Sequence, residues 1–338
     1  MEGTRGDFGN CFDDWGNRFT SNAGTPIIQA VIPARYIAQN PYLTVSRLSI
    51  SIFQSEGRLF PIRKPEPWRV VRQDFWSRWV DTTHEMRATR FPSRELTPQG
   101  YITGSAAVEI YRGSVYPKAF QGNAFTPEPA GNVVIRSILE TAGLTFLARR
   151  ADTDREFIAS TDNWFRPVNL ANGPDGFLYM MDMYREVIED PSAIPHDILE
   201  HIDYYTGQDM GPIYRIAPDG FKGHRPPRLA NADVDELVGM LEHPDSWWRE
   251  TAHRLLFERQ DKRGGEGLIK LARTSKLPQG RLHALWSLEG LGILDETTLL
   301  TALDDPHPAL LENAVRLAER QLPKSQIIRK KVFPWFPM

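Results

Sequence analysis

The residues best suited to hold a ligand gather in one short loop: Asp162, Asn163, Trp164 and Arg166. The guanidinium group of an arginine is a planar fork that grips a carboxylate through two parallel hydrogen bonds. Aspartate and asparagine side chains can form hydrogen bonds with the same molecule, and an indole ring can stack on it. The loop therefore predicts a cofactor-binding site for a planar, anionic ligand.

The same residues also have ordinary structural explanations. Arg166 can pair with a neighbouring acid such as Asp162 or Asp182. The Asp162-Asn163 pair is typical of a turn, because both side chains can hydrogen-bond to the nearby backbone. Both interpretations remain open from the sequence.

Other patterns that carry chemistry are missing from the chain. His196 and His201 are five positions apart, and no HExxH motif, phosphate-binding loop or nucleophile elbow occurs. Cys11 is the only cysteine, which excludes a disulfide, a cysteine zinc site and a CxxCH haem site within this chain. We therefore assign no catalytic residue and no metal ligand.

Composition indicates an ordinary globular protein. The 338 residues are 41% hydrophobic and 25% charged, with a formal net charge of -3. This charge gives no case for a nucleic-acid partner. The sequence contains no run of 18 apolar residues, so it predicts no membrane span. The first residues lack the apolar stretch of a signal peptide.

The fold class that we predict is multidomain, β followed by α. Residues 1–225 are rich in glycine, proline and aromatic residues, and a strand-and-turn pattern recurs at 12–19, 166–182 and 214–220. A repeated hairpin of this kind is typical of a β-propeller blade. Residues 66–79 carry apolar side chains at helical spacing. The predicted strands are 27–32, 48–54, 107–111, 132–139, 144–149, 177–181 and 213–216.

Residues 226–325 have a helical pattern that repeats about every 30 residues. Pairs of predicted helices cover 234–241 with 247–256, 267–272 with 281–288, and 297–303 with 310–317. The pattern resembles HEAT repeats, which stack helix pairs into a solenoid. We expect five leucines to be buried between the helix layers: Leu255, Leu256, Leu285, Leu288 and Leu317. Residues 326–338 are expected to form an irregular tail.

The length of the β region limits how many blades it holds. A blade takes roughly 40–45 residues, so residues 1–225 accommodate three or four. A propeller buries the faces of its sheets between neighbouring blades, so this number should not close a ring of six. We therefore expect the chain to be a fragment of a larger protein.

Several segments together resemble a known family. They are 12–19 (FDDWGNRF), 36–43 (YIAQNPYL), 109–113 (EIYRG), 122–132 and 166–182. As a set they are similar to the membrane-bound dehydrogenase, or haem-binding, proteins of planctomycetes and other members of the PVC superfamily. That family resembles a six-bladed propeller of the quinoprotein glucose dehydrogenase type, followed by HEAT repeats and a c-type cytochrome module.

The resemblance implies a function for the full-length parent. It implies an extracytoplasmic, periplasmic oxidoreductase that oxidises a sugar or alcohol substrate through pyrroloquinoline quinone and calcium. In such dehydrogenases an arginine in the segment that corresponds to Arg166 pairs with carboxylates of the quinone. The blades with the catalytic base and the calcium loop would lie upstream, and the haem module downstream, so we expect this chain alone to be inactive.

A second function class fits the same sequence. Propellers and helical solenoids also serve as recognition surfaces without catalysis. The alternative is therefore a non-catalytic scaffold that binds a protein partner on its HEAT-like surface.

Overall fold

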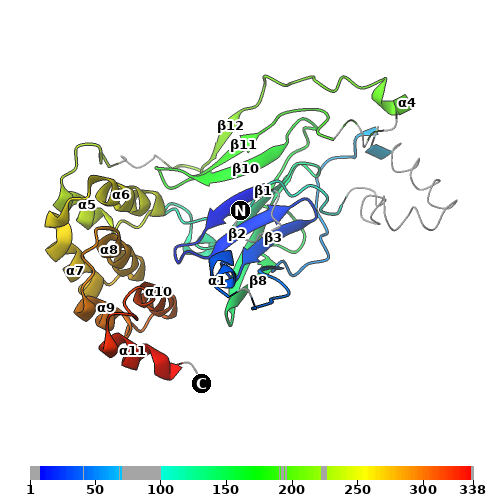
Figure 1. The fold of residues 1–338 in the computed structure, drawn as a ribbon. Coiled ribbons are helices and arrows are strands. Elements are labelled where there is room, and N and C mark those ends of the chain that lie inside the picture. The colour runs from blue at the N-terminus through cyan, green and yellow to red at the C-terminus, as the bar shows by residue number, and fades with distance from the viewer. Residues whose placement is uncertain are drawn as a thin grey trace.

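Among the described residues, the strands lie in the first two thirds of the chain and the longer helices in the last third (Figure 1). The computed structural model describes residues 8–40, 42–67, 69–70, 100–189, 191, 194, 196–221 and 227–335. The change from strands to helices falls between β12 (Ile213–Ile216) and α5 (Val234–Met240). The predicted order, β before α, is confirmed.

The first sheet is antiparallel, with the strand order β1-β2-β3-β4. Asp13 shapes the β1–β2 turn, because its Oδ1 atom accepts hydrogen bonds from the backbone N–H groups of Trp15 and Asn17, each at 2.9 Å. Gly16 completes this turn with a φ of 85°, which glycine adopts without a steric cost. The strands are β1 (Phe8–Phe12), β2 (Arg18–Asn22), β3 (Thr25–Ala30) and β4 (Ser49–Ser51).

The second sheet has the order β5-β6-β7-β8, and β9 pairs with the start of β7. All five residues of β6 are buried. This strand was not among the predicted ones, because Pro127 stands inside it and proline lacks the N–H group that a sheet ladder uses. The strands are β5 (Glu109–Ile110), β6 (Ala124–Glu128), β7 (Val133–Ala142), β8 (Thr145–Arg150) and β9 (Ile158–Ala159).

The third sheet contains β10 (Pro167–Asn172), β11 (Leu178–Asp182) and β12, all antiparallel. The predicted turn at 173–176 connects β10 to β11. The N–H group of Gly173 donates to the carbonyl of Phe177 at 2.8 Å, and Gly176 has a φ of 82°. The Tyr111 hydroxyl donates to the carbonyl of Gly176 at 2.8 Å, which ties this turn to the second sheet.

The three sheets pack against one another in chain order. β1 contacts β5, β3 contacts β8, and β10 contacts both β5 and β6. One apolar cluster, which includes Phe19, Ile27 and Ile110, fills the space between the first and second sheets. A second cluster, which includes Phe125 and Phe177, joins the second to the third. Within the described part of the chain none of these sheets closes into a barrel.

Short helical segments connect the larger elements. They are α1 (Ala34–Ala38), α4 (His196–Leu199), η1 (Lys118–Phe120), η3 (Lys262–Gly264) and η4 (Phe333–Trp335). Most of the helix predicted over 66–79 lies outside the described residues, because Trp68 and residues 71–79 are not among them.

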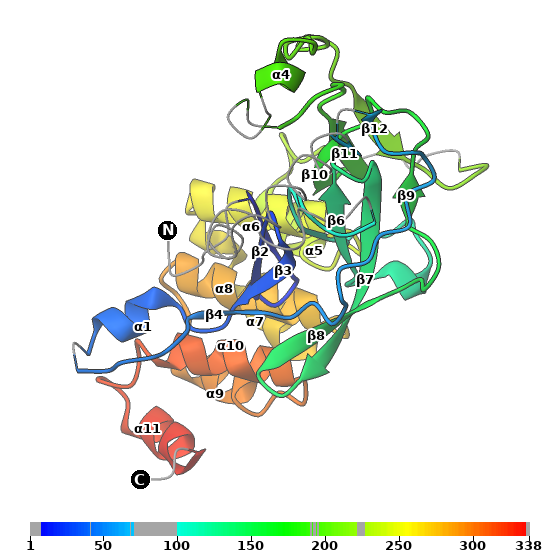
Figure 2. The same cartoon turned by 90° about the vertical axis from the view of Figure 1, so that its right-hand side faces the viewer.

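The helices of the last third form two layers (Figures 1 and 2). α6, α8 and α10 make an inner layer beside the sheets, and α5, α7 and α9 make an outer layer, with α11 at the end of the stack. No helix of the described residues is long and apolar enough to cross a membrane. Their bounds are α6 (Ser246–Arg259), α7 (Gly265–Thr274), α8 (Pro278–Gly290), α9 (Glu296–Ala302), α10 (Pro308–Ala318) and α11 (Gln326–Val332).

Small side chains allow the helices to approach closely. Ala252, Ala284 and Ala314 occupy equivalent positions on α6, α8 and α10, and each is fully buried. Of the leucines expected in the core, Leu256, Leu285, Leu288 and Leu317 are buried. Leu255 differs, because it is only partly buried at the edge of this cluster.

The prediction of an irregular tail over 326–338 is wrong for residues 326–332, which form α11. The Ser325 side chain caps this helix by accepting a hydrogen bond from the N–H group of Ile328 at 3.0 Å. Ile328 and Val332 are buried on one face of α11, while the basic residues between them face away from the apolar cluster. Burial of that face stabilises a helix in a segment that was expected to be irregular.

Candidate functional site

The loop that was predicted to bind a ligand joins β9 to β10. Asp162 and Asn163 are exposed, and Trp164 is half-buried. The Asp162 carboxylate accepts hydrogen bonds from the backbone N–H of Trp164 at 2.9 Å and from the Tyr184 hydroxyl at 3.1 Å. The Trp164 ring packs beside the Tyr184 ring, with centroids 5.7 Å apart. These contacts fold the loop onto its own neighbourhood.

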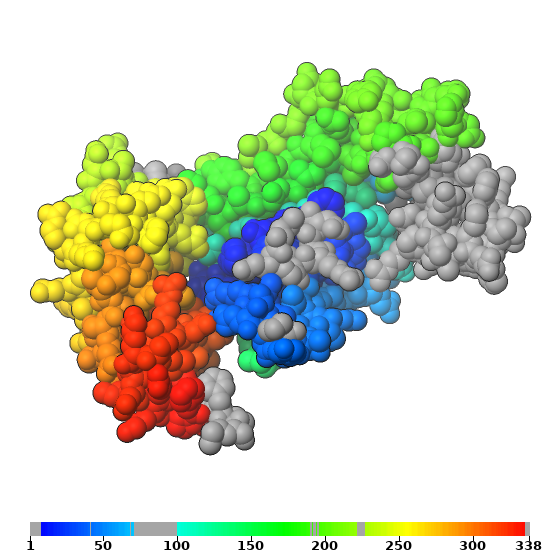
Figure 3. Space-filling model, in the orientation of Figure 1, coloured from blue at the N-terminus to red at the C-terminus, as the bar shows by residue number. Residues whose placement is uncertain are grey.

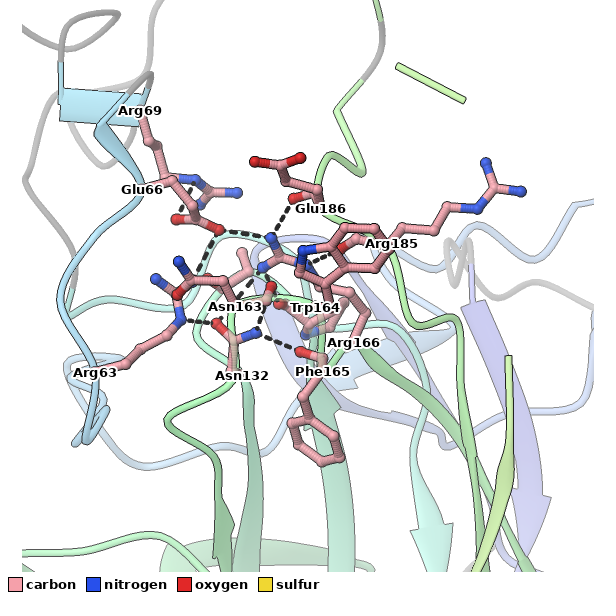
Figure 4. A network of polar contacts seen from close by, with 12 residues as sticks. Arg63, Glu66, Arg69, Asn132, Asn163, Trp164, Phe165, Arg166, Arg185 and Glu186 are labelled. Atoms are coloured by element: carbon pink, nitrogen blue, oxygen red, sulfur yellow. Dashed lines mark hydrogen bonds and ion pairs between the residues drawn. The ribbon is translucent and has the colours of Figure 1, made fainter. Parts of the chain in front are cut away.

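Arg166 points away from this surface and is completely buried (Figure 4). Its Nε donates to the carbonyl of Arg185 at 2.9 Å, and Nη1 donates to the carbonyl of Pro129 at 3.1 Å. Nη2 donates to the carbonyl of Glu186 at 2.5 Å and to Glu66 Oε1 at 2.6 Å. All three nitrogens of the guanidinium therefore already contact acceptors within the protein.

Glu66 is the centre of an arginine cluster, which we define as Arg63, Arg69 and Arg166 around this carboxylate (Figure 4). Arg63 Nη2 lies 3.0 Å from Oε1, and Arg69 Nε lies 3.6 Å from Oε2. Burial by itself would raise the pKa of Glu66, but Arg69, Arg166 and Arg63 outweigh it and hold the pKa below its usual value. Glu66 is therefore ionised at neutral pH.

Asn132 connects the arginine cluster to the predicted loop. Its Nδ2 donates to the carbonyls of Asp162 and Asn163, both at 3.3 Å, and to that of Phe165. Its Oδ1 accepts a hydrogen bond from Arg63 Nε. The backbone of Asn132 has a φ of 57°, in the left-handed region that asparagine tolerates better than most residues. This residue fixes the loop above Arg166.

The structure brings together a different set of residues from the predicted one. Neither Asp162 nor Asp182 pairs with the Arg166 guanidinium; Asp182 Oδ1 accepts the backbone N–H of Arg166 at 2.7 Å instead. The sequence did not identify Glu66, Arg63, Arg69 or Asn132. The Gly131-Asn132 turn could have indicated Asn132. Nothing local indicates Arg63, Glu66 and Arg69, because they lie about 100 positions before Arg166 in the chain.

The arginine cluster holds three cations against one central carboxylate. Arg69 also pairs with Glu189 at 3.3 Å. Glu66 occupies the place that a ligand carboxylate would take beside Arg166, so the residues fit an anionic quinone only if Glu66 gives up this partner. Among the described residues, no group of three histidine, cysteine or acidic side chains is arranged to hold a metal ion.

A cavity of about 530 Å³ lies where the sheets meet the helices, and we call it the interface pocket. Figure 3 shows the N-terminal residues, in blue, lying against the helical stack. The β1–β2 turn forms one wall of the pocket, Arg112 forms another, and the inner helices α6, α8 and α10 form the rest. Both parts of the chain therefore build this cavity.

Charged side chains at the interface pocket are paired across the two parts. Asp14 Oδ1 accepts a hydrogen bond from Arg249 Nη2 at 2.7 Å, and Oδ2 accepts from Gln279 at 3.3 Å. The Arg112 guanidinium forms an ion pair with Glu250. These contacts join the β1–β2 turn and the end of β5 to α6 and α8.

Two histidines from neighbouring helices also line the interface pocket. The Nδ1 atoms of His253 and His283 are 3.2 Å apart, so one ring donates its N–H to the other. Burial lowers the pKa of both residues, and for His283 the neighbouring His253, Arg249 and Arg112 lower it further. Both rings are neutral at pH 7, and the ring that accepts this hydrogen bond carries its proton on Nε2.

Comparison with known proteins supplies a family and no activity. Neither the curated proteins nor the solved structures contain a match to this chain. Residues 1–220 match the family described as "Domain of unknown function (DUF7133)". The match covers 220 of the 338 residues and includes all three sheets, the arginine cluster and the β1–β2 turn. The chain therefore belongs to the DUF7133 family.

Proposed function

We propose that this chain is a binding scaffold, built from a partial β-propeller and a HEAT-like solenoid. The observation that carries the proposal is the state of Arg166, the residue best placed to hold a cofactor. Its guanidinium is fully buried and contacts Glu66 and three backbone carbonyls. A group engaged in this way stabilises the fold and offers no ready site for a ligand.

The packing of the sheets supports a propeller-like arrangement for residues 1–225. Three antiparallel sheets follow one another along the chain, and apolar clusters join each sheet to the next. Propeller blades are sheets of this size that bury their faces against neighbouring blades. The open sheets are consistent with a ring to which this chain contributes some of the blades.

Two arginines support a repeat relationship within the helical stack. Arg249 and Arg281 occupy equivalent positions near the start of α6 and α8. Arg249 Nη1 donates to the carbonyls of His243 and Pro244, both at 2.8 Å, and Arg281 Nη1 donates to the carbonyl of Ser275 at 2.7 Å. Each arginine ties its helix to the loop before it, as expected for repeated units of one solenoid.

A protein partner is the expected ligand of this scaffold, on the exposed surface of the helical stack. Phe257 on α6 and Ile327 on α11 are large apolar side chains that are each more than half exposed. The test is to place a photo-crosslinking amino acid at position 257 or 327 and to irradiate cells that express the protein. Position 144, in the β7–β8 turn, is a matched exposed control.

The scaffold proposal predicts a discrete crosslinked species from the helical positions and none from position 144. Crosslinks that do not differ among the three positions would contradict it. Detection of the protein alone at every position would contradict it as well.

The second candidate function is the dehydrogenase that the sequence resemblance implies. The three arginines around Glu66 favour it, because together they could hold a ligand with several carboxylates. In a full-length parent, pyrroloquinoline quinone would accept the electrons from a sugar or alcohol, and calcium would polarise it. Arg63, Arg69 and Arg166 would bind and orient its carboxylates. An extracytoplasmic location of the parent is part of the same proposal.

The two functions can be separated with the chain as it is. Both proposals predict no quinone-dependent reduction of a dye with glucose or ethanol, even after pyrroloquinoline quinone and calcium are added, so the binding of the quinone decides between them. Glu66→Gln should leave the arginines without their carboxylate, so the dehydrogenase proposal predicts that this variant binds the quinone more tightly than the wild type. Equal, weak binding by both proteins, measured by calorimetry, would favour the scaffold.

A further inference from the structure

The interface pocket has the size and the construction of a small-molecule site. Its volume of about 530 Å³ lies within the range of known ligand cavities, roughly 300–1,000 Å³. Its walls come from segments that are far apart in the sequence, the β1–β2 turn and three consecutive inner helices. Such a cavity exists only when both parts of the chain are folded and docked.

Aromatic side chains form a large part of its walls. Phe12 is 43% exposed, and the Trp286 ring is held in place because its Nε1 donates to Asn313 Oδ1 at 3.0 Å. Asn313 in turn donates to the carbonyl of Trp15 at 3.1 Å. The indole is therefore positioned before any ligand arrives, and a fixed ring is a good surface for another flat ring.

The carboxylates of the interface pocket already have partners from other parts of the chain or from their own turn. Asp14 is bound by Arg249 and Gln279, and Glu250 is bound by Arg112. Asp13 is occupied by its own turn, where it accepts hydrogen bonds from Trp15 and Asn17. These acids are thus poorly placed to attract a cationic ligand.

Among the described residues, two lining arginines pair only with glutamates one turn away on their own helices. Arg254 and Glu258 are both exposed on α6, with 3.6 Å between Nε and Oε1. Arg316 pairs with Glu312, which is more than half exposed on α10. An ion pair between side chains one helical turn apart contributes little to stability when its carboxylate is exposed, so the carboxylate of a ligand can replace it. The available charge of the interface pocket is therefore positive.

We propose that the interface pocket binds a planar aromatic molecule that carries a carboxylate. The ring lies against Trp286 and Phe12, and the carboxylate is held by Arg254 and Arg316. This ligand class follows from the fixed aromatic wall, the occupied acids and the two arginines with exchangeable partners. The proposal is independent of the arginine cluster around Glu66, which lies in another part of the molecule.

The experiment compares two probes of the same shape by isothermal titration calorimetry. 2-Naphthoate carries the carboxylate, and 2-naphthamide replaces it with a neutral amide. We expect 2-naphthoate to bind about tenfold more tightly, because a hydrogen bond to a charged group adds more than one to a neutral group. Equal affinities, or no binding of 2-naphthoate by the folded protein, would overturn the proposal.

Single substitutions locate the binding. Arg316→Gln and Arg254→Gln should each weaken 2-naphthoate binding several-fold and leave 2-naphthamide unaffected. Phe12→Ala, at an exposed position, should weaken both probes. Arg320→Gln is the matched control, because Arg320 is an exposed arginine that pairs with Glu289 and does not line the pocket. Loss of binding in the control alone, or in none of the variants, would place the probe elsewhere and reject the site.

Discussion

Arg166 is the largest side chain that the described part of the molecule buries completely. A buried guanidinium is tolerated only where a carboxylate and enough acceptors surround it. Glu66 and three backbone carbonyls provide these acceptors, and they come from three separate segments of the chain. The residue therefore joins the start of β10 to the 129–132 turn, to residues 185–186 and to the segment that carries Glu66.

Replacing Arg166 with Met should destabilise the protein by about 3–5 kcal/mol, because three carbonyls lose a donor and Glu66 loses its closest cation. Urea denaturation measures this free energy of unfolding. Arg155→Met is the control, since Arg155 is 77% exposed and should change stability by less than about 0.5 kcal/mol. A loss below about 1 kcal/mol for Arg166→Met would contradict the structural role.

Glu128 gives a prediction about pH. Its carboxyl is fully buried and accepts hydrogen bonds from the N–H groups of Thr103 and Gly104, at 3.2 and 3.0 Å. Burial raises its pKa from 4.5 to about 7, although the two N–H groups oppose the change. Folding thus favours the protonated form. The stability from this group is complete below pH 4.5 and is lost as the pH rises through 7.

The expected loss from this residue is about 3 kcal/mol between pH 4.5 and pH 8. Glu128→Gln, which cannot ionise, should remove that part of the pH dependence. Denaturation curves at several pH values measure the slope. Glu109, whose pKa burial also raises to about 7, should contribute separately, so Glu109→Gln provides an independent comparison. An unchanged slope in Glu128→Gln would contradict the assignment.

At this scale the sequence points to Arg166 but not to the residues that Arg166 contacts. Arg166 stands out in the sequence, because a charged side chain just before an apolar strand is expected to be buried and therefore to have a partner. Glu66 does not stand out, since it lies about 100 positions away between two prolines. A contact between distant segments leaves no local pattern in composition or spacing, so only the fold reveals it.

Among elements, the helices were easier to predict than the strands. Each of the six helices from α5 to α10 overlaps its predicted range, because apolar residues recur there at helical spacing. Strand β6 was missed because Pro127 argues against a sheet position. Helix α11 was missed because three basic residues separate its two buried apolar residues, Ile328 and Val332. These two pack against the apolar cluster of the other helices, a contact that the sequence does not show.

The helical core predicts a contrast between two leucines. Leu285 is completely buried between the layers, so Leu285→Ala should cost about 2–5 kcal/mol through lost contacts and a cavity. Leu255 is partly exposed, and Leu255→Ala should cost less than half as much. Thermal or urea denaturation compares the two variants. Similar losses would show that the layers do not pack as described.

At the scale of the whole molecule, the turns of the β region are also its points of attachment to the helices. The Trp15 carbonyl accepts from Asn313 on α10, and the Pro174 carbonyl accepts from Trp248 Nε1 at 2.6 Å. The carbonyl of Arg112 accepts the N–H group of Ser246 at 3.1 Å. Motifs that the sequence identifies as hairpin turns therefore hold the two parts of the chain together, which no periodic pattern could reveal.

This shared interface should make the two parts unfold as one unit. Asp14 is central to it, because Arg249 is 2% exposed and donates to Asp14 at 2.7 Å. We expect a single calorimetric transition for the wild-type protein, with equal opening free energies for the amides of β2 and α8 in hydrogen exchange.

Asp14→Ala removes the acceptor of a buried cation, at a cost of about 2 kcal/mol. It should therefore divide the transition in two, with the helical stack opening separately from the sheets. Asp219→Ala, at an exposed position, should preserve the single transition. Two transitions in the wild-type protein, or an undivided transition in Asp14→Ala, would show that this contact does not couple the sheets to the helices.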